Sequence, residues 1–493
     1  MIEINVKIHD KFSFEFKTSF ITNKKTFLYE KANEFSINTW MFIPNNLDIN
    51  RSTYSKDSFY KDNKSNIRLI TPVYLLSEIY DKQNPDSPIC RIKEAFKAFA
   101  ADVENTDAFE NYTFQIKMFS SITKSAIRDR VNYIISECGS ADIQNLIENY
   151  IHDVKMINRG YHDLWLLINK QDITKEQQDH YFFGDDFIGN VIEQHTYALM
   201  GVIERYSVYD LVKKDLVGLV KSGMKRKIEK GYSYVDEDNP TNNYLVIMRR
   251  SMLKKYMESD LYLNTKQTKD GAIAEQMYYA IAAGVSMIFA TIISFSAQLH
   301  YGNFTIPLFF ALVISYAFKD RIKDLMRYYF STQLGKKYFD TKRELEMRNQ
   351  KIGWVKEAFD FVLENKVPEE VSNLRKRSPL VEAENKIYNE QILLYKKLVS
   401  LSSGKIKKYK GYKYIGINDI TRFNVTHFIQ KMDNPFVSLY LPDDEFGYKT
   451  IESEKVYTIY FIIRAESENV LYYRKFRLLF NREGIKNIVE IND

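Results

Sequence analysis

The chain has 493 residues, of which 27% are charged and 45% hydrophobic, and its formal net charge is +6. This length leaves room for two or three domains, and so mild a positive charge does not by itself favour a nucleic-acid-binding protein. The two cysteines, Cys90 and Cys138, exclude a disulfide framework or a zinc site built on cysteines, and they indicate a reducing compartment.

The N-terminal segment, residues 1–80, is predicted to be rich in β-strands. Apolar and polar residues alternate from Ile2 to Ile8 and again from Phe12 to Phe16, on either side of a short polar turn. An alternation of period two around a turn is typical of a β-hairpin. A third strand is predicted over residues 35–43, ended by Pro44.

Residues 81–270 are predicted to form a cytosolic helical domain. Apolar residues recur at helical spacing over residues 109–134, and further helices fit residues 142–169, 187–230 and 243–263. Short polar segments, such as the acidic turn over residues 236–240, separate these helices. This arrangement is typical of a helical bundle.

Residues 276–318 contain no Lys, Arg, Asp or Glu. The first apolar stretch, residues 277–297, reaches about 30 Å as a helix, which is the thickness of a bilayer's hydrocarbon core. The second, residues 305–318, is shorter, although Lys319 could extend it by reaching toward the membrane surface. We predict a two-helix transmembrane hairpin over residues 275–320. The alternatives are a hairpin buried in a soluble core and a hairpin closed only by oligomerisation. The residues predicted to lie in the membrane are Ile281, Ile288, Phe289, Ile292, Leu308, Phe309, Val313 and Ile314.

Basic residues flank this apolar region on both sides, whereas the loop between the two stretches has none. The positive-inside rule therefore places both flanks, and with them both termini, in the cytosol. The abundance of Asn, Ile, Lys, Tyr and Phe is typical of a bacterial chain from an AT-rich genome, so we predict a location in the bacterial inner membrane. The predicted partners are the lipid bilayer and either another protein or further copies of this chain.

After the apolar region, residues 321–403 are predicted to form a helical stalk, with helices over residues 354–365 and 380–402. Residues 404–493 return to the spacing of strands separated by turns, which predicts a small antiparallel β domain. The fold class predicted from the whole chain is an α+β membrane-anchored protein.

Histidines and acids concentrate in the predicted helical domain. The doublets His152–Asp153 and His162–Asp163 combine imidazole with carboxylate, which suits a divalent metal that could activate water against a phosphoester. However, a spacing of ten residues turns the two histidines to different sides of one continuous helix, unless Gly160 breaks that helix. Solvated or capping side chains are the alternative, and the absence of nucleotide-binding and nucleophile motifs does not favour an enzyme. No cofactor is predicted.

Two groups of basic residues are candidates for contact with anionic lipid headgroups or, less favoured, with nucleic acid. The alternatives are a solvated helix face and an edge strand protected by lysine. These residues are Lys225, Arg226 and Lys227 in the first group and Lys407, Lys408 and Lys410 in the second.

Three functions agree with these patterns. The sequence favours a membrane-anchored interaction or sensor protein that binds a protein partner or self-assembles. The first alternative is an effector whose hairpins rearrange on sensing and perturb the bilayer, as in some bacterial defence systems. The second is a membrane-tethered metal-dependent phosphohydrolase.

Overall fold

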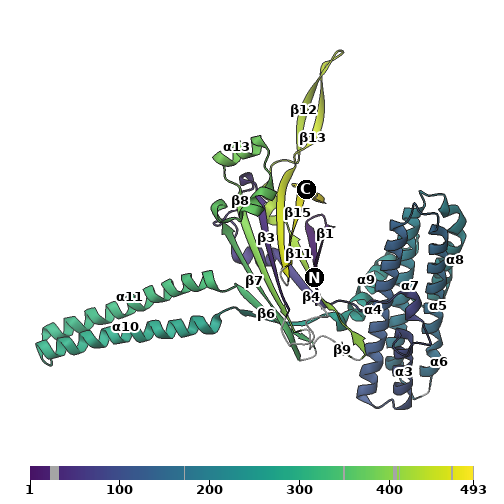
Figure 1. Cartoon of the computed structure of the whole chain (residues 1–493), viewed down its shortest axis with the longest axis horizontal. Helices are drawn as coiled ribbons and strands as arrows, with labels where there is room; N and C mark the ends of the chain where they lie inside the picture. Colours follow the sequence, from purple (N-terminus) through teal and green to yellow (C-terminus); the bar gives the residue numbers. More distant parts are fainter. Residues whose placement is uncertain are drawn as a thin grey trace. The chain divides into compact units, whose positions relative to one another are not determined.

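The computed structural model describes residues 1–22, 33–170, 172–347, 350–402, 408–409, 411–467 and 470–491. The chain divides into two compact units, which are described separately (Figure 1). The sheet unit comprises Met1–Ile67, Asn264–Ile406 and Gly416–Asp493, and the helical unit comprises Arg68–Leu263 and Lys407–Ile415.

The sheet unit contains an eight-stranded and a four-stranded sheet. The larger has the order β16-β15-β14-β3-β8-β7-β6-β5, and each neighbouring pair of its described strands is antiparallel. Its strands are β3 (Asn33–Ile43), β5 (Asn264–Lys269), β6 (Thr341–Met347), β7 (Gln350–Val362), β8 (Gln391–Leu401), β14 (Tyr457–Ser467), β15 (Val470–Asn481) and β16 (Gly484–Glu490). The smaller has the order β1-β2-β11-β4, with β1 (Ile2–Asp10), β2 (Ser13–Ile21), β11 (Gly416–Asn424) and β4 (Asn63–Leu69).

Aromatic side chains join the two sheets of this unit into one core. The ring of Phe14 on β2 lies 5.3 Å from that of Phe461 on β14. Phe59, on the short helix α1 (Lys56–Asp62), stacks on Phe359 of β7 with ring centroids 4.2 Å apart. Because β3 pairs with β8 on one side and β14 on the other, strands from both ends of the chain share this core.

Smaller elements complete the sheet unit. The strands β12 (Phe436–Asp443) and β13 (Gly447–Glu454) form a two-stranded ribbon of their own among the described strands. The short helices are α12 (Glu369–Arg375), α13 (Pro379–Ile387) and α15 (Thr426–Ile429), with 3-10 turns at Asn45–Leu47 and Glu364–Lys366.

The helical unit is built around the long helices α4 and α7. Asn105 caps α4 by accepting hydrogen bonds from the amides of Asp107 and Ala108, and Thr174 caps α7 through a capping box with Gln177. Its helices are α2 (Leu76–Ile79), α3 (Pro88–Ala101), α4 (Thr106–Ser136), α5 (Ile143–Asp163), α6 (Trp165–Ile168), α7 (Lys175–Ile203), α8 (Val208–Glu229) and α9 (Pro240–Met257). A 3-10 turn at Ser259–Leu261 and the strand pair β9 (Lys408–Tyr409) and β10 (Tyr412–Lys413) also belong to it.

The predicted α+β class is confirmed, with N-terminal strands, a helical middle and a C-terminal antiparallel region. The predicted helical stalk is wrong beyond Lys337: residues 354–365 fall largely in strand β7, and residues 380–402 form most of α13 and the strand β8. Both strands carry a charged residue on the inner face, Glu357 on β7 and Lys397 on β8, and these side chains form a buried ion pair at 3.1 Å. Charges at buried positions hide the alternation by which a strand is recognised.

Candidate membrane interface

The apolar region forms two long helices that connect the edge strand β5 with its neighbour β6. These helices are α10 (Ala272–Tyr301) and α11 (Ile306–Lys337), and they lie side by side (Figure 1). In α11 the side chains of 332 and 334–337 are outside the described residues. Positive φ angles at Gly302 and Phe304, 74° and 64°, reverse the chain between the helices.

Small side chains fill the contact between the two helices. Ala282 and Ser286 of α10 are fully buried, Ala290 and Ala297 are nearly so, and Ser315 faces them from α11. These α10 positions recur at helical spacing on one face. Small residues allow two helices to approach closely, which is the usual way for helices to pack within a membrane.

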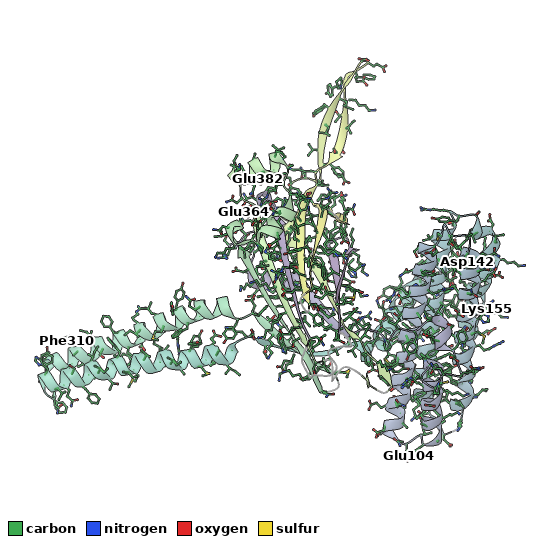
Figure 2. The ribbon with its side chains drawn as sticks, viewed as in Figure 1. Glu104, Asp142, Lys155, Phe310, Glu364 and Glu382 are labelled. Atoms are coloured by element: carbon green, nitrogen blue, oxygen red, sulfur yellow. The ribbon has the colours of Figure 1, made fainter. Side chains whose placement is uncertain are left out.

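The large apolar side chains of the same helices point outward. Ile288 is 61% exposed and Val313 is 51% exposed. Phe310, near the turn of the hairpin, also lies on the outside (Figure 2). Of the eight predicted membrane residues, Leu308 is half-buried and the others are exposed, namely Ile281, Ile288, Phe289, Ile292, Phe309, Val313 and Ile314. Exposing so continuous an apolar surface to water is costly, whereas exposing it to lipid is not.

Several hydroxyl groups within this hairpin are satisfied by backbone carbonyls. Thr291 donates to the carbonyl of Met287 at 2.8 Å, and Ser294 donates to that of Ala290 at 2.8 Å. Ser315 of α11 also donates to the Ala290 carbonyl, at 3.1 Å, and so joins the two helices. A polar group in the hydrocarbon region must find its partner inside the protein, and these hydroxyls do so.

The pairing of the helices sets the depth over which both are uncharged. The Ser315–Ala290 contact fixes the register, and one turn further along α11 Lys319 lies level with Ser286. From this level to the turn, the uncharged part of α11 extends about 20 Å, compared with about 30 Å for a bilayer's hydrocarbon core. Among the described residues, α10 has the length and composition of a membrane-spanning helix. The prediction of two complete spans therefore stays unconfirmed, because in α11 charge begins at Lys319.

Two aspartates connect the root of the hairpin, where α10 begins and α11 ends, to the larger sheet. Asp270 pairs with Lys356 of β7 at 3.0 Å and accepts a hydrogen bond from the amide of Phe339 at 3.2 Å. Asp340 accepts hydrogen bonds from the amide of Phe359 at 2.8 Å and from the Lys56 ammonium at 2.6 Å. These contacts fix the points at which α10 begins and the strand after α11 starts.

The four residues predicted as metal ligands do not come together. His152 and Asp163 are exposed. Asp153 accepts a hydrogen bond from the Tyr80 hydroxyl at 2.8 Å. His162 forms a hydrogen bond with Asp185 of α7. The described part of the chain contains no group of three or more side chains that could hold a metal ion. The arrangement therefore offers no support for a metal-dependent hydrolase.

His162 instead belongs to a buried ionic network in the helical unit. Its Nε2 donates to Asp185 at 2.7 Å, and its Nδ1 accepts from the Arg226 guanidinium at 2.6 Å, which fits a neutral imidazole. Burial lowers the pKa of His162. The Asp185 carboxylate acts in the opposite direction, but burial together with the charges of Arg226 and Lys230 keeps the pKa below its ordinary value. Burial alone would raise the pKa of Asp185, but hydrogen bonds from His162 and Lys230 outweigh it and hold the pKa at about 2.

The predicted basic surface on α8 is mostly engaged inside the helical unit. Arg226 donates to His162, as described above. Lys227 is buried and donates to the Asn190 side chain at 2.8 Å and to Glu193. Lys225 is exposed and lies 3.9 Å from Glu229. In the second group, Lys407 and Lys410 and the side chain of Lys408 lie outside the described residues.

Comparisons with protein-family models, with curated proteins and with solved structures find no match for this chain.

Proposed function

We propose that this protein is a membrane-anchored interaction protein held to a lipid bilayer by the hairpin of α10 and α11. The single observation that carries the proposal is the inverted burial of the hairpin, with alanine and serine between the helices and isoleucine, valine and phenylalanine on the outside. In water the large side chains would face the partner helix. In lipid they gain nothing from doing so, and close packing of small residues decides the interface.

Basic and aromatic side chains near the root support the orientation. Lys319 lies 4.9 Å from the ring of Tyr316, and the Arg327 guanidinium lies 5.4 Å from the ring of Tyr279. Tyrosine and basic residues favour the headgroup region, and the basic side of a membrane protein faces the anionic cytosolic leaflet. The proposal therefore places both units in the cytosol at the bacterial inner membrane.

The ribbon of β12 and β13 supports a role in binding another protein. Val437, Leu439 and Ile451 are exposed on one face, and Tyr440 and Tyr448 are exposed on the other. A two-stranded ribbon of this kind is only marginally stable in water. A protein partner that covers either face would stabilise it.

Flotation with lipid vesicles that contain anionic lipid tests the membrane proposal. The purified full chain should float with the vesicles, and Ile288→Arg/Val313→Arg should reduce the bound fraction by more than about tenfold, because one arginine in the bilayer centre costs about 3 kcal/mol. The matched control is Leu166→Arg/Leu211→Arg, which adds the same charge at exposed leucines of the helical unit. Equal flotation of the two double variants, or no flotation of the wild type, would overturn the proposal.

A second candidate function is a membrane-perturbing effector, favoured by the short uncharged depth of α11. A hydrophobic length of about 20 Å is shorter than the bilayer core, so the surrounding lipid thins to match it unless Lys319 reaches the membrane surface. Release of a trapped dye from the same vesicles distinguishes the two functions. Release by the wild type but not by Ile288→Arg/Val313→Arg supports the effector, and flotation without release supports the anchor.

A further inference from the structure

Helix α10 carries a second apolar stripe on the face turned away from α11. Its members are spaced alternately by four and three residues, which are the spacings of positions a and d in a heptad repeat. At about 100° per residue this stripe lies nearly opposite the buried small residues. The stripe consists of the exposed side chains of Ile281, Val285, Ile288, Ile292, Phe295 and Leu299.

Smaller or polar residues border the stripe along one side, namely Gly284, Thr291 and Gln298. Along the other side lie Ser296 and the partly exposed ring of Phe289. Lipid chains surround a helix without distinguishing one part of its outer face from another. A surface that meets lipid alone therefore has no reason to order large and small residues in this way, whereas an interface with another helix does.

Gly284 indicates how closely another helix could approach. An added Cβ at this position would have nothing within 4 Å, so no packing inside the chain requires a glycine. Glycine nevertheless destabilises a helix by about 1 kcal/mol relative to alanine. Its bare backbone leaves a hole one turn from both Ile281 and Ile288, and a large side chain of another helix could fill that hole.

We propose that α10 packs against α10 of a second copy of this chain along this stripe, an inference that rests on the proposed membrane role. Two copies in one bilayer have their roots on the same side, so their α10 helices run parallel. Such an interface pairs identical surfaces and places the isoleucines of each copy around Gly284 of the other. Its apolar character and heptad spacing make it complementary to itself.

Cysteine cross-linking in vesicles tests this interface. In a Cys90→Ser/Cys138→Ser background that still floats, Ile292→Cys is compared with Val313→Cys. The two positions lie at the same depth and are 63% and 51% exposed, but they lie on the outer faces of different helices. Mild oxidation should give a covalent dimer several-fold more readily with Ile292→Cys. Equal or reversed yields in protein that floats would overturn this inference alone, whereas protein that does not float would overturn the membrane role.

A substitution at the glycine provides a second test that does not depend on cysteine geometry. Gly284→Leu fills the hole and should abolish the Ile292→Cys dimer, while flotation is kept because leucine is more apolar and more helix-forming than glycine. The smaller Gly284→Ala should reduce the dimer only partly. An unchanged dimer yield with Gly284→Leu would show that the helices do not meet at this position.

Discussion

The helices α4 and α10 have almost the same length, 31 and 30 residues, and each packs against another long helix, yet they bury opposite kinds of side chain. Helix α4 buries Phe114 and Phe119, whereas α10 buries Ala282 and Ser286 and exposes its large residues. In the helical unit the removal of apolar surface from water decides which face turns inward. In the hairpin, the burial of large apolar side chains does not decide which faces of the two helices meet. Close contact between small residues decides it instead.

Charges follow the same contrast. Helix α7 buries Asp185 and Asp186, and each has a basic partner, Lys230 at 2.8 Å and Arg249 at 2.5 Å respectively. A buried charge is tolerated where the protein supplies such a partner. The stretch 276–318 avoids the problem, since it has no acidic or basic side chain other than His300.

Truncating one phenylalanine in α4 and one in the hairpin should give the largest difference. Phe119→Ala removes a fully buried side chain of α4 and should lower the free energy of unfolding by about 3–5 kcal/mol. Phe310→Ala removes an exposed side chain of α11, outside the stripe on α10, and should change it by less than about 0.5 kcal/mol. Denaturant unfolding in mild detergent, followed by circular dichroism, measures both. A loss at Phe310 as large as that at Phe119 would mean that the hairpin packs like helices of a soluble core.

Acid should weaken the helical unit while leaving the hairpin unchanged. The folded pKa values of His162 and Asp185 both lie below their ordinary values, so their contribution is complete at neutral pH and is lost as the pH falls. The loss begins below about pH 6.5 with His162, and Asp185, with its pKa at about 2, adds about 2 kcal/mol between about pH 4 and pH 2. Burial raises the pKa of Asp186, which partly offsets this loss. Hydrogen exchange resolved by segment should show the change in α5 and α7 and not in α10.

The control for this prediction is His162→Gln. The glutamine amide can donate to Asp185 and its carbonyl can accept from Arg226, but it does not titrate. The weakening between pH 7 and pH 5 should therefore be smaller in this variant, and the part that remains is expected from His180 and His195 of α7, whose pKa values burial also lowers. An unchanged weakening would show that His162 does not contribute to it.

The smallest expected effect concerns the hydroxyl that joins the two helices of the hairpin. Ser315→Ala removes the hydrogen bond to the Ala290 carbonyl and should weaken the α10–α11 contact by about 0.6 kcal/mol, the average for such bonds in membrane proteins. The control is Ser294→Ala, whose hydroxyl bonds to the same carbonyl from within α10. Hydrogen exchange of the hairpin in vesicles should quicken with the first variant only. The same change with both variants would contradict a special role for the bond between helices.

Hydrophobic spacing was sufficient to predict the N-terminal strands, the helical middle and most C-terminal strands, because each of these elements has a regular apolar period. It failed at β7 and β8, where Glu357 and Lys397 occupy buried positions and neutralise each other. The expected helix over residues 187–230 is in fact two helices, since α7 ends at Ile203 and α8 starts at Val208. The hydrophobic spacing of one segment does not reveal which distant residues will pair with its side chains.

The same limit applied to the candidate sites. The apolar composition of residues 276–318 marked the hairpin. The register that brings Lys319 level with Ser286 depends on which faces of the two helices meet. His162 was paired with its neighbour Asp163 in the sequence, whereas its partner in the fold is Asp185 on another helix. Spacing along one helix cannot reveal a contact made between two.

The position of β3 has a consequence for the order in which the protein is synthesised. This strand leaves the ribosome early, but its two neighbours, β8 and β14, begin only at Gln391 and Tyr457. Nearly all of the helical unit and the whole hairpin are therefore translated before the larger sheet can close. During this interval β3 has two unpaired edges, which are prone to pairing with other chains. A hairpin that reaches a bilayer at this stage would separate the nascent chains from one another until their last strands arrive.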